Sequence, residues 1–258
     1  MSIFAYNNRA LKSGQFTGTV GAWATTPAIE NMATAQVPTP HARVTPDAGA
    51  IAFTYEAQDS GGDPENMTVD VLALIAHTLP DSAVVTFLDG ATELAQVTYI
   101  VGANKAAPGF VVAVLSAPVT LDTITVSIAS AGSEPVRIGT FWASGSFRHM
   151  INPDDYSDVP SAFDRLSSVD AVVWPNRRAR IETISAEFYD LSEPKAIGPS
   201  AENWRDITRQ VGYSEPVLFM PAERLVTEVH YGLITDYSRI GPRWFNSWTG
   251  GFTLKGML

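Results

Sequence analysis

The chain has 258 residues, of which 45% are hydrophobic and 17% charged, and its formal net charge at pH 7 is −10. This length suffices for one large domain or two ordinary ones. The acidic balance argues against a protein whose main task is to bind nucleic acid. Cysteine is absent from the sequence, which excludes disulfides and thiolate metal or redox sites.

No apolar run approaches the roughly 18 residues that a membrane span requires, so we expect no insertion into a membrane. The first ten residues, MSIFAYNNRA, lack the basic and then apolar pattern of a secretory signal. We therefore expect the protein to be made and folded in a cytoplasm. If it reaches the outside of a cell, we expect it to do so as part of a released particle.

Residues 1–45 are rich in Ala, Thr, Pro, Gly and Asn, and they show no sustained periodicity. Stretches such as Gly18–Trp23 and Val37–His41 favour extended, irregular chain. We predict an extended N-terminal arm over residues 1–45, which lies over its own domain or over a neighbour.

Residues 46–148 contain short β-rich runs with Gly, Pro, Asp and Asn between them. Such repeated runs are typical of an antiparallel sandwich. The strongest turn signal is Asp89-Gly90, which predicts a tight turn at the end of the third run. We therefore predict an antiparallel β-sandwich, of jelly-roll or galactose-binding-like type, over residues 46–148. The runs are Ile51–Tyr55, Met67–Ala76, Ala83–Leu88, Leu94–Val101, Gly109–Leu115, Leu121–Ala129 and Val136–Trp142.

A polar, proline-containing connection over residues 149–176 marks a domain boundary. Beyond it, Pro199–Gly212 is the one convincing helix: Trp204, Ile207 and Val211 recur at helical spacing, and Pro199 or Ser200 opens it. Residues 149–258 are predicted to form a β-α-β-β-β assembly domain, a small split barrel or sheet with one packed helix. Its strands are expected in 179–191 and near 216–220, 226–237 and 244–257.

Strand-like sequence continues almost to the last residue, and a terminal strand needs a neighbour to pair with. This closing segment is also rich in aromatic side chains, which are enriched in the cores of protein interfaces. We predict that the last strand completes the small barrel, and that the outer edge of the barrel and the aromatics form a subunit interface. The predicted interface residues are Tyr231, Tyr237, Trp244, Phe245, Trp248 and Phe252.

The sequence shows no recognisable catalytic constellation. The histidines at positions 41, 77, 149 and 230 lack metal-ligand spacing, and no HExxH pattern occurs. Ser144-Gly-Ser146 lacks the flanking glycines of a nucleophile elbow. No catalytic, metal-binding or cofactor-binding residue is predicted, and we do not expect an enzyme.

Two charged clusters admit more than one interpretation. The loops Asp59–Glu65 and Asp154–Asp158 bring together oxygen ligands that suit Ca²⁺, but ordinary polar loops share this composition and are favoured. Arg177, Arg178 and Arg180 are interpreted as a solvated strand entrance that pairs with local acids.

Tryptophans offer a possible surface for sugar rings, because carbohydrate stacking needs an exposed aromatic platform. Trp23 lies in an irregular segment and Trp142 at a strand end, and they are the candidate glycan contacts. A place in the core or in an interface is the favoured alternative, since large aromatics are usually buried there.

Three segments carry a resemblance to a known family: Val69–Pro80, Ala83–Gly90 and Val136–Gly145. They resemble the galactose-binding-like, or discoidin-like, sandwich of tailed-phage virion proteins. In the second half, Arg177–Arg180, Glu215–Phe219 and Tyr231–Leu233 are similar to the sheet-plus-helix region of the same proteins. The barrel-with-helix pattern also resembles the split barrel with which tail-tube and distal-tail proteins form rings.

The resemblance implies a structural component of a bacteriophage tail tip or baseplate, assembled in the host cytoplasm and located in the virion tail. Its expected partners are copies of itself in a homo-oligomeric ring and other phage tail proteins, with no nucleic acid. The sandwich would project for docking or for contact with a host-surface glycan. The alternative hypothesis is a carbohydrate-binding adhesion module that recognises host glycans, and the third is a polysaccharide depolymerase.

Overall fold

The computed structural model describes residues 1–12, 14–33, 41–101, 109–151, 157–160, 182–198, 203–222, 228–244 and 247–256. The fold is mainly β, built of antiparallel sheets with short α-helices, which confirms the predicted fold class. No helix in these ranges is long and apolar enough to cross a membrane. The chain divides into two compact units: unit 1 is Met1–Arg148 with Glu215–His230, and unit 2 is His149–Ser214 with Tyr231–Leu258.

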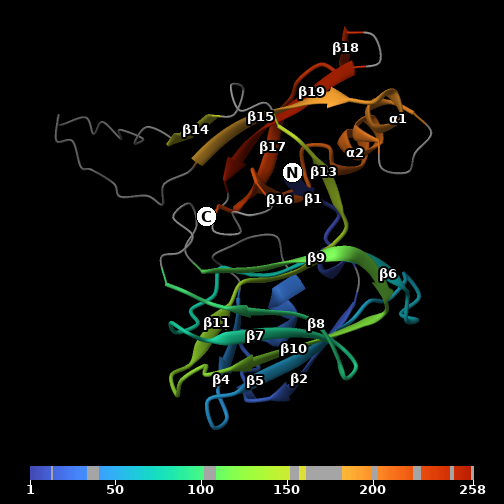
Figure 1. The fold of residues 1–258 in the computed structure, drawn as a ribbon. Coiled ribbons are helices and arrows are strands. Elements are labelled where there is room, and N and C mark those ends of the chain that lie inside the picture. The colour runs from blue at the N-terminus through green and yellow to red at the C-terminus, as the bar shows by residue number, and fades with distance from the viewer. Residues whose placement is uncertain are drawn as a thin grey trace, which may run out of the picture. The chain divides into compact units, whose positions relative to one another are not determined.

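Unit 1 contains a β-sandwich (Figure 1). One layer is a five-stranded antiparallel sheet in the order β2-β5-β10-β7-β8, and two three-stranded sheets, β11-β4-β3 and β12-β6-β9, face it. The five-stranded sheet comprises β2 (Gln15–Val20), β5 (Ile51–Glu56), β10 (Thr123–Ala129), β7 (Val84–Asp89) and β8 (Thr92–Thr98). The other layer comprises β3 (Ala22–Trp23), β4 (Ala42–Thr45), β6 (Met67–Ile75), β9 (Phe110–Leu121), β11 (Val136–Ile138) and β12 (Thr140–Ser144).

The core of the sandwich follows from the period-two pattern of its strands, which points successive side chains to opposite faces. In β10, Ile124, Val126 and Ile128 are fully buried, and the polar residues between them are only partly covered. Across the sandwich, Phe141 of β12 meets Phe53 of β5 edge to face, with ring centroids 5.7 Å apart. Such aromatic pairs stabilise a core beyond the area that they bury.

Each predicted run of residues 46–148 contains or overlaps a strand. The last predicted run, Val136–Trp142, is interrupted at Gly139 and supplies two strands in place of one. The first, β11, pairs with β4, and the second, β12, pairs with β6. A single β-rich run thus contributes to two different sheets.

The extended arm predicted over residues 1–45 is, in its described part, folded into unit 1. β1 (Ser2–Ala5) is buried and pairs antiparallel with β16 (Pro216–Met220), and β2, β3 and β4 belong to the sandwich. Asn8 fixes the start of the chain: its Nδ2 donates to the Phe141 carbonyl and its Oδ1 accepts from the Ala143 N–H, both at 2.9 Å. These strands are short and are fixed partly by side-chain hydrogen bonds, so they leave no periodicity in the sequence. The turns between them include the 3₁₀ segments η1 (Arg9–Leu11) and η2 (Ile29–Ala33).

Unit 2 is built around an antiparallel sheet in which β19 is an interior strand. At Leu254, β19 pairs with Ile184 of β15 on one side and with Ile234 of β17 on the other. Both edges of the last strand are therefore paired within the chain at this position, as expected of a strand that completes the sheet. The strands are β14 (Ser157–Pro160), β15 (Glu182–Leu191), β17 (His230–Tyr237), β18 (Gly241–Trp244) and β19 (Ser247–Gly256).

Two short helices accompany this sheet, α1 (Glu193–Ala196) and α2 (Trp204–Val211) (Figure 1). The cap of α2 is Asn203, whose Oδ1 accepts from the Asp206 N–H at 2.9 Å, and not the predicted Pro199 or Ser200. Its buried residues are the three that the helical spacing predicts, and Trp204 packs on Phe188 of β15 at 4.8 Å. The four residues of α1 are too few to show a helical period.

His77 follows β6 and is held in a buried, neutral state. Its Nδ1 accepts a hydrogen bond from the Leu79 N–H at 3.2 Å, and its ring meets the Tyr99 ring at 4.5 Å. Burial lowers the pKa of His77 from 6.5 to about 4, against a smaller raising effect of a hydrogen bond with the Phe110 backbone. The folded state of unit 1 therefore favours the neutral form of the His77 imidazole.

This depressed pKa gives the stability of unit 1 a defined pH dependence. Between about pH 6.5 and 4 the unfolded chain takes up a proton at His77 and the folded chain does not, so stability falls as the pH falls. The difference in pKa corresponds to about 3 kcal/mol by the bottom of this window. In urea unfolding measured from pH 7.5 to 4, His77→Gln is expected to flatten this slope, whereas the control His41→Gln retains it. Equal slopes for the two variants would contradict the assignment.

The interior position of β19 predicts that Leu254 stabilises unit 2. Leu254 is fully buried, so Leu254→Ala is expected to lower the free energy of unfolding by about 2–5 kcal/mol. Its exposed neighbour Lys255 is the control, and Lys255→Ala is expected to change stability by no more than about 0.5 kcal/mol. Urea unfolding measures both, and an unchanged stability of Leu254→Ala would refute the interior assignment.

Candidate functional site

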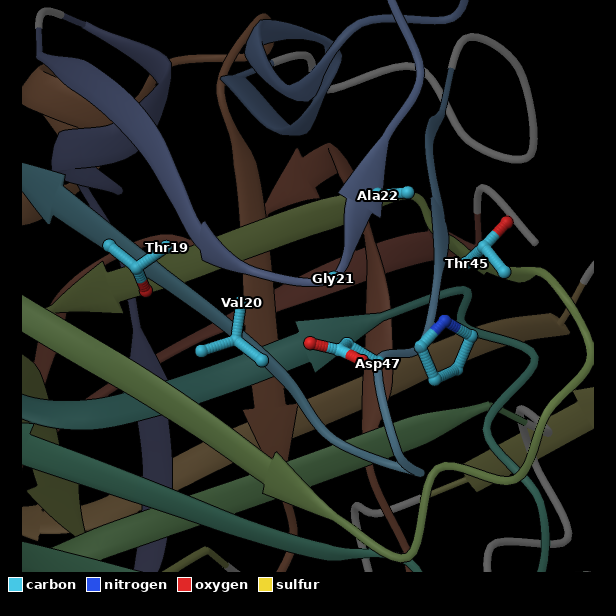
Figure 2. Close-up of a pocket in the computed structure, with 7 residues that line it drawn as sticks. Thr19, Val20, Gly21, Ala22, Thr45 and Asp47 are labelled. Atoms are coloured by element: carbon cyan, nitrogen blue, oxygen red, sulfur yellow. The ribbon is translucent and has the colours of Figure 1, made fainter.

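An open pocket in unit 1 is lined by Thr19–Ala22, between β2 and β3, and by Thr45–Asp47, at the end of β4 (Figure 2). Its volume is about 480 Å³, within the roughly 300–1,000 Å³ of small-ligand sites. The lining combines the hydroxyls of Thr19 and Thr45 with the carboxylate of Asp47 and the side chain of Val20, which is 36% exposed. The pocket thus combines polar groups with an apolar wall, to which Ala22 and Pro46 also contribute.

Gly21 brings the two segments together. Its φ of +94° lies in the region that favours glycine, and a Cβ there would lie 2.8 Å from a Val44 methyl group and 3.1 Å from the Thr45 carbonyl oxygen. A residue with a side chain would therefore push the β2–β3 turn away from β4. This close approach sets the position of Val20 relative to Thr45.

A tight turn holds Asp47 at the rim of the pocket. The backbones of Asp47 and Ala50 exchange two hydrogen bonds, of 2.9 and 2.8 Å. Ala48 and Gly49 between them both have positive φ, at 48° and 78°, as in a type I′ turn. The turn fixes the Asp47 backbone, and Figure 2 shows the carboxylate pointing toward Val20.

Trp23, one of the two predicted glycan contacts, holds the backbone of Val20, a residue that lines the pocket. Its indole N–H donates to the Val20 carbonyl at 3.1 Å, and its ring meets Phe53 edge to face at 5.7 Å. A Cβ on Gly18 would come within 2.3 Å of the Trp23 ring, so the indole lies directly on that glycine. Trp23 is half-buried and is not among the residues that line the pocket.

Trp142, the other predicted contact, is fully buried, and its indole N–H donates to Ser144 Oγ at 2.8 Å. It therefore has no face to offer to a sugar. The structure does not bring the two tryptophans together in one site, because every residue of β12, Trp142 included, is buried.

The predicted interface residues divide into core and partly exposed positions. Tyr231 and Phe252 are 2% and 3% exposed, so they are core residues of unit 2 and have no surface to offer to a neighbour. Trp248 is half-buried. Tyr237 is also half-buried, and its hydroxyl donates to the Gly212 carbonyl at 2.8 Å. The side chain of Trp244, and Phe245 as a whole, lie outside the described residues.

The acidic loop around Asp59 uses its carboxylate for its own turn. Asp59 Oδ1 accepts from the backbone N–H groups of Gly61 at 2.8 Å and Asp63 at 3.0 Å. Over the described ranges, no group of three or more His, Cys, Asp or Glu side chains converges to hold a metal ion. The side chains of the Asp154–Asp158 cluster and the residues Arg177–Arg180 lie outside those ranges.

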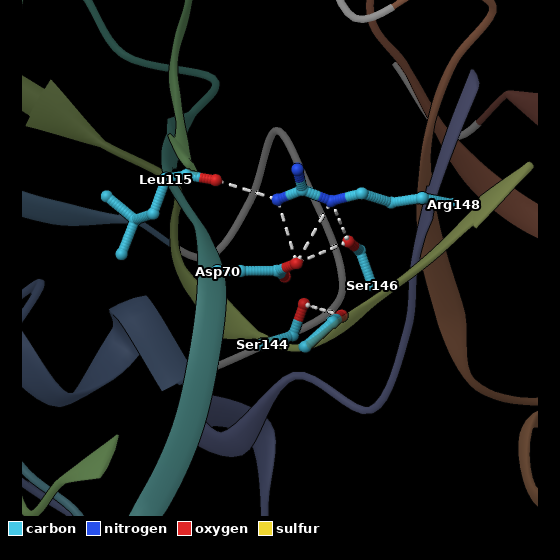
Figure 3. A network of polar contacts seen from close by, with 6 residues as sticks. Asp70, Leu115, Ser144, Ser146 and Arg148 are labelled. Carbon is cyan, nitrogen blue, oxygen red and sulfur yellow. Dashed lines mark hydrogen bonds and ion pairs between the residues drawn. The ribbon is translucent and has the colours of Figure 1, made fainter. Parts of the chain in front are cut away.

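A second polar cluster, around Asp70, links three strands of unit 1 (Figure 3). Asp70 of β6 is buried, and its Oδ2 accepts from Ser146 Oγ at 2.8 Å and from Arg148 Nη2 at 2.9 Å. Arg148 also donates to the Leu115 carbonyl of β9 at 2.8 Å, and both Ser146 and Arg148 belong to β13 (Ser146–His149). The cluster pairs its charges and contains no histidine to activate a serine, so it fits a structural cross-link.

No protein-family model matches the chain, and no curated protein matches it. Among solved structures it is similar to CpGH89CBM32-6, produced by Clostridium perfringens, with 12% identity, a TM-score of 0.37, and coverage of 53% of this chain and 98% of that one. CpGH89CBM32-4 of the same organism gives 12% identity, a TM-score of 0.36, and coverage of 54% and 99%.

The Ruminococcus gnavus GH29 fucosidase E1_10125, in complex with fucose, gives 10% identity, a TM-score of 0.38, and coverage of 55% of this chain and 27% of that one. Identities and TM-scores this low do not bear on the function of the present chain.

The close approach at Gly21 predicts a specific cost for a side chain there. Gly21→Ala combines the strain of positive φ with a clash against Val44 and Thr45, and is expected to lower the free energy of unfolding by about 2–4 kcal/mol. Gly62 is the matched control, because its φ is +88° and a Cβ there would meet nothing within 4 Å. Gly62→Ala should lose only about 1 kcal/mol, from strain alone. Equal losses in urea unfolding would show that the approach of the turn to β4 does not constrain the pocket.

Proposed function

We propose that unit 1 binds carbohydrate, without catalysis, at the pocket formed by Thr19–Ala22 and Thr45–Asp47. The proposal rests on the composition of this pocket, whose lining combines two threonines and an aspartate with the apolar Val20, Ala22 and Pro46. A sugar ring presents hydroxyls at its edge and C–H groups on its faces. Threonine hydroxyls donate and accept hydrogen bonds, an ionised carboxylate accepts them, and Val20 can meet an apolar face of the ring.

The rigidity of the pocket supports the same function. Its two walls are short turns at the ends of paired strands, fixed by the Asp47–Ala50 hydrogen bonds and by the Trp23 bond to Val20. A preformed site has less conformational entropy to lose on binding, which matters for a shallow pocket that makes few contacts.

The number of ionisable groups favours binding over hydrolysis at this site. Asp47 is the one ionisable side chain among the residues that line the pocket. Glycoside hydrolysis by the usual mechanisms requires two carboxyl groups on either side of the scissile bond. A single carboxylate can accept hydrogen bonds from sugar hydroxyls but does not supply that pair.

The phage tail role and the homo-oligomeric ring remain predictions from the sequence. Carbohydrate recognition requires neither, although it is compatible with contact between a virion and a host surface. The carbohydrate proposal is preferred because it rests on side chains that line the pocket.

Glycan binding by the full chain tests the proposal. A glycan array identifies ligands, and calorimetry on the best ligand compares Asp47→Asn and Thr45→Val with the unaltered protein. Each substitution removes hydrogen-bonding capacity in the pocket, and we expect the affinity to fall roughly 10-fold, and up to 100-fold for the charged group.

Asp89→Asn is the matched control, because Asp89 is another exposed acid at a tight turn of the same sandwich. It should leave the affinity unchanged. The absence of any bound glycan, or equal affinities of Asp47→Asn and Asp89→Asn, would reject the pocket as a sugar site. Trp142→Ala is not a suitable test, since it removes a core side chain.

A further inference from the structure

Two arginines face each other across neighbouring strands of unit 1. β4 and β11 pair antiparallel, and Arg43 lies directly opposite Arg137. Both arginine side chains are exposed, and the residues on either side of each are buried: Ala42 and Val44 in β4, Val136 and Ile138 in β11. The two arginine side chains therefore project from the same outward face of the sheet. We call Arg43 and Arg137 the arginine pair.

This arrangement costs stability in the absence of a ligand. Directly opposed residues of an antiparallel pair have Cβ atoms about 4.5–5.5 Å apart, and like charges at this separation are destabilising. The chain carries a net charge of −10, so acidic side chains are available to neutralise cations. No ion pair or side-chain hydrogen bond joins either guanidinium to another described residue.

The other lysine and arginine side chains in the described part of unit 1 are paired. Arg9 contacts Glu65, Lys12 lies 3.6 Å from Glu215, and Arg148 lies 2.9 Å from Asp70. The arginine pair alone departs from this pattern, and its members lie next to one another. Unpaired cations at one place on an acidic protein form a local site for an anion.

The arginine pair adjoins the pocket. Arg43 and Thr45 are two residues apart in β4 and both point outward, which places them about 6–7 Å apart along one face. Thr45 lines the pocket, and Asp47 lies beyond it on the same segment. A ligand in the pocket can therefore extend past Thr45 to the arginine pair with its negative group away from Asp47.

We propose that Arg43 and Arg137 bind an anionic group of the same carbohydrate whose hydroxyls occupy the pocket, so that unit 1 recognises acidic glycans. The identity of the ligand as a glycan rests on the function proposed above. The planar guanidinium matches a carboxylate or a sulfate ester with two parallel hydrogen bonds. The shared chemistry is an oxyanion on a sugar, and its two sources are a uronic-type carboxylate and a sulfate ester.

The test measures the affinity of the full chain for three oligosaccharides of equal length: one with carboxylates, one with sulfate esters and one neutral. We expect at least one acidic oligosaccharide to bind more tightly than the neutral one. Arg43→Gln and Arg137→Gln should each lower the acidic affinity roughly 10- to 100-fold, the loss associated with a charged hydrogen-bonded contact, and leave the neutral affinity unchanged. Comparing the carboxylated and the sulfated ligand identifies the source of the anion.

Arg239→Gln is the matched control, because it removes an equal charge from another exposed arginine, in unit 2. It should not alter the acidic affinity. Arg43→Lys keeps the charge but loses the planar two-donor geometry, so its affinity should lie between those of the unaltered protein and Arg43→Gln. If Arg43→Gln and Arg239→Gln lowered the affinity for the acidic oligosaccharide equally, the effect would be due to net charge alone, and the proposal would be overturned.

Thermal unfolding without ligand separates binding from folding. Because each glutamine removes a repulsion, the Tm of Arg43→Gln and of Arg137→Gln should stay unchanged or rise. A lower Tm together with the lost affinity would overturn the proposal by assigning the arginines a structural role.

Failure of this inference and failure of the proposed function are distinguishable. Neutral glycans that bind through Thr45 and Asp47, with no preference for acidic ones, would reject the anion site and leave the pocket standing. Inorganic sulfate is the second probe. If it binds in a manner that depends on both Arg43 and Arg137 while no glycan binds, the anion site stands and the carbohydrate function falls.

Discussion

The register of β4 between β3 and β11 is the constraint on which the candidate site depends. Val44 points into the core and pairs with Trp23 of β3 and Val136 of β11, so the residues on either side of it, Arg43 and Thr45, must point outward. A shift by one residue would expose Val44 and turn both outward side chains into the core. The burial of Val44 in the core of unit 1 therefore determines that Arg43 and Thr45 are the side chains of β4 that face a ligand.

The same strands hold the backbone firmly and leave the arginine side chains without intramolecular partners among the described residues. The Arg43 carbonyl accepts from the Ala24 N–H at 2.9 Å. The backbone N–H of Arg137 donates to Thr78 Oγ1 at 2.9 Å, and its carbonyl accepts from the Thr78 N–H at 3.0 Å. Fixed backbones position the Cα atoms of the pair, and the long side chains retain the rotamer freedom needed to fit an anion. Binding would restrict that freedom, at a cost in entropy that the charged contacts must exceed.

The sequence predicts local features of this fold better than long-range ones. Alternation in β10 and the spacing of Trp204, Ile207 and Val211 report burial directly, so the strands of the sandwich and the main helix are predictable. The arginine pair is not predictable from the sequence. Arg43 and Arg137 face each other only because β4 pairs with β11, and no local pattern encodes that pairing. Aromatic content misleads for a related reason: it does not distinguish a core residue such as Phe252 from an interface residue, since both bury large apolar surfaces.

The acidity of the whole chain and an anion site on unit 1 are compatible because the two act over different distances. At physiological ionic strength, charges beyond about 8 Å are largely screened, so distant carboxylates weaken an anion contact only slightly. A guanidinium in direct contact with an oxyanion is screened much less. A nucleic acid differs from a glycan with a single negative group, because its regularly spaced phosphates would also lie against acidic surface. The net charge of −10 thus disfavours long polyanions, whereas the arginine pair can still hold one oxyanion next to a pocket for neutral hydroxyls.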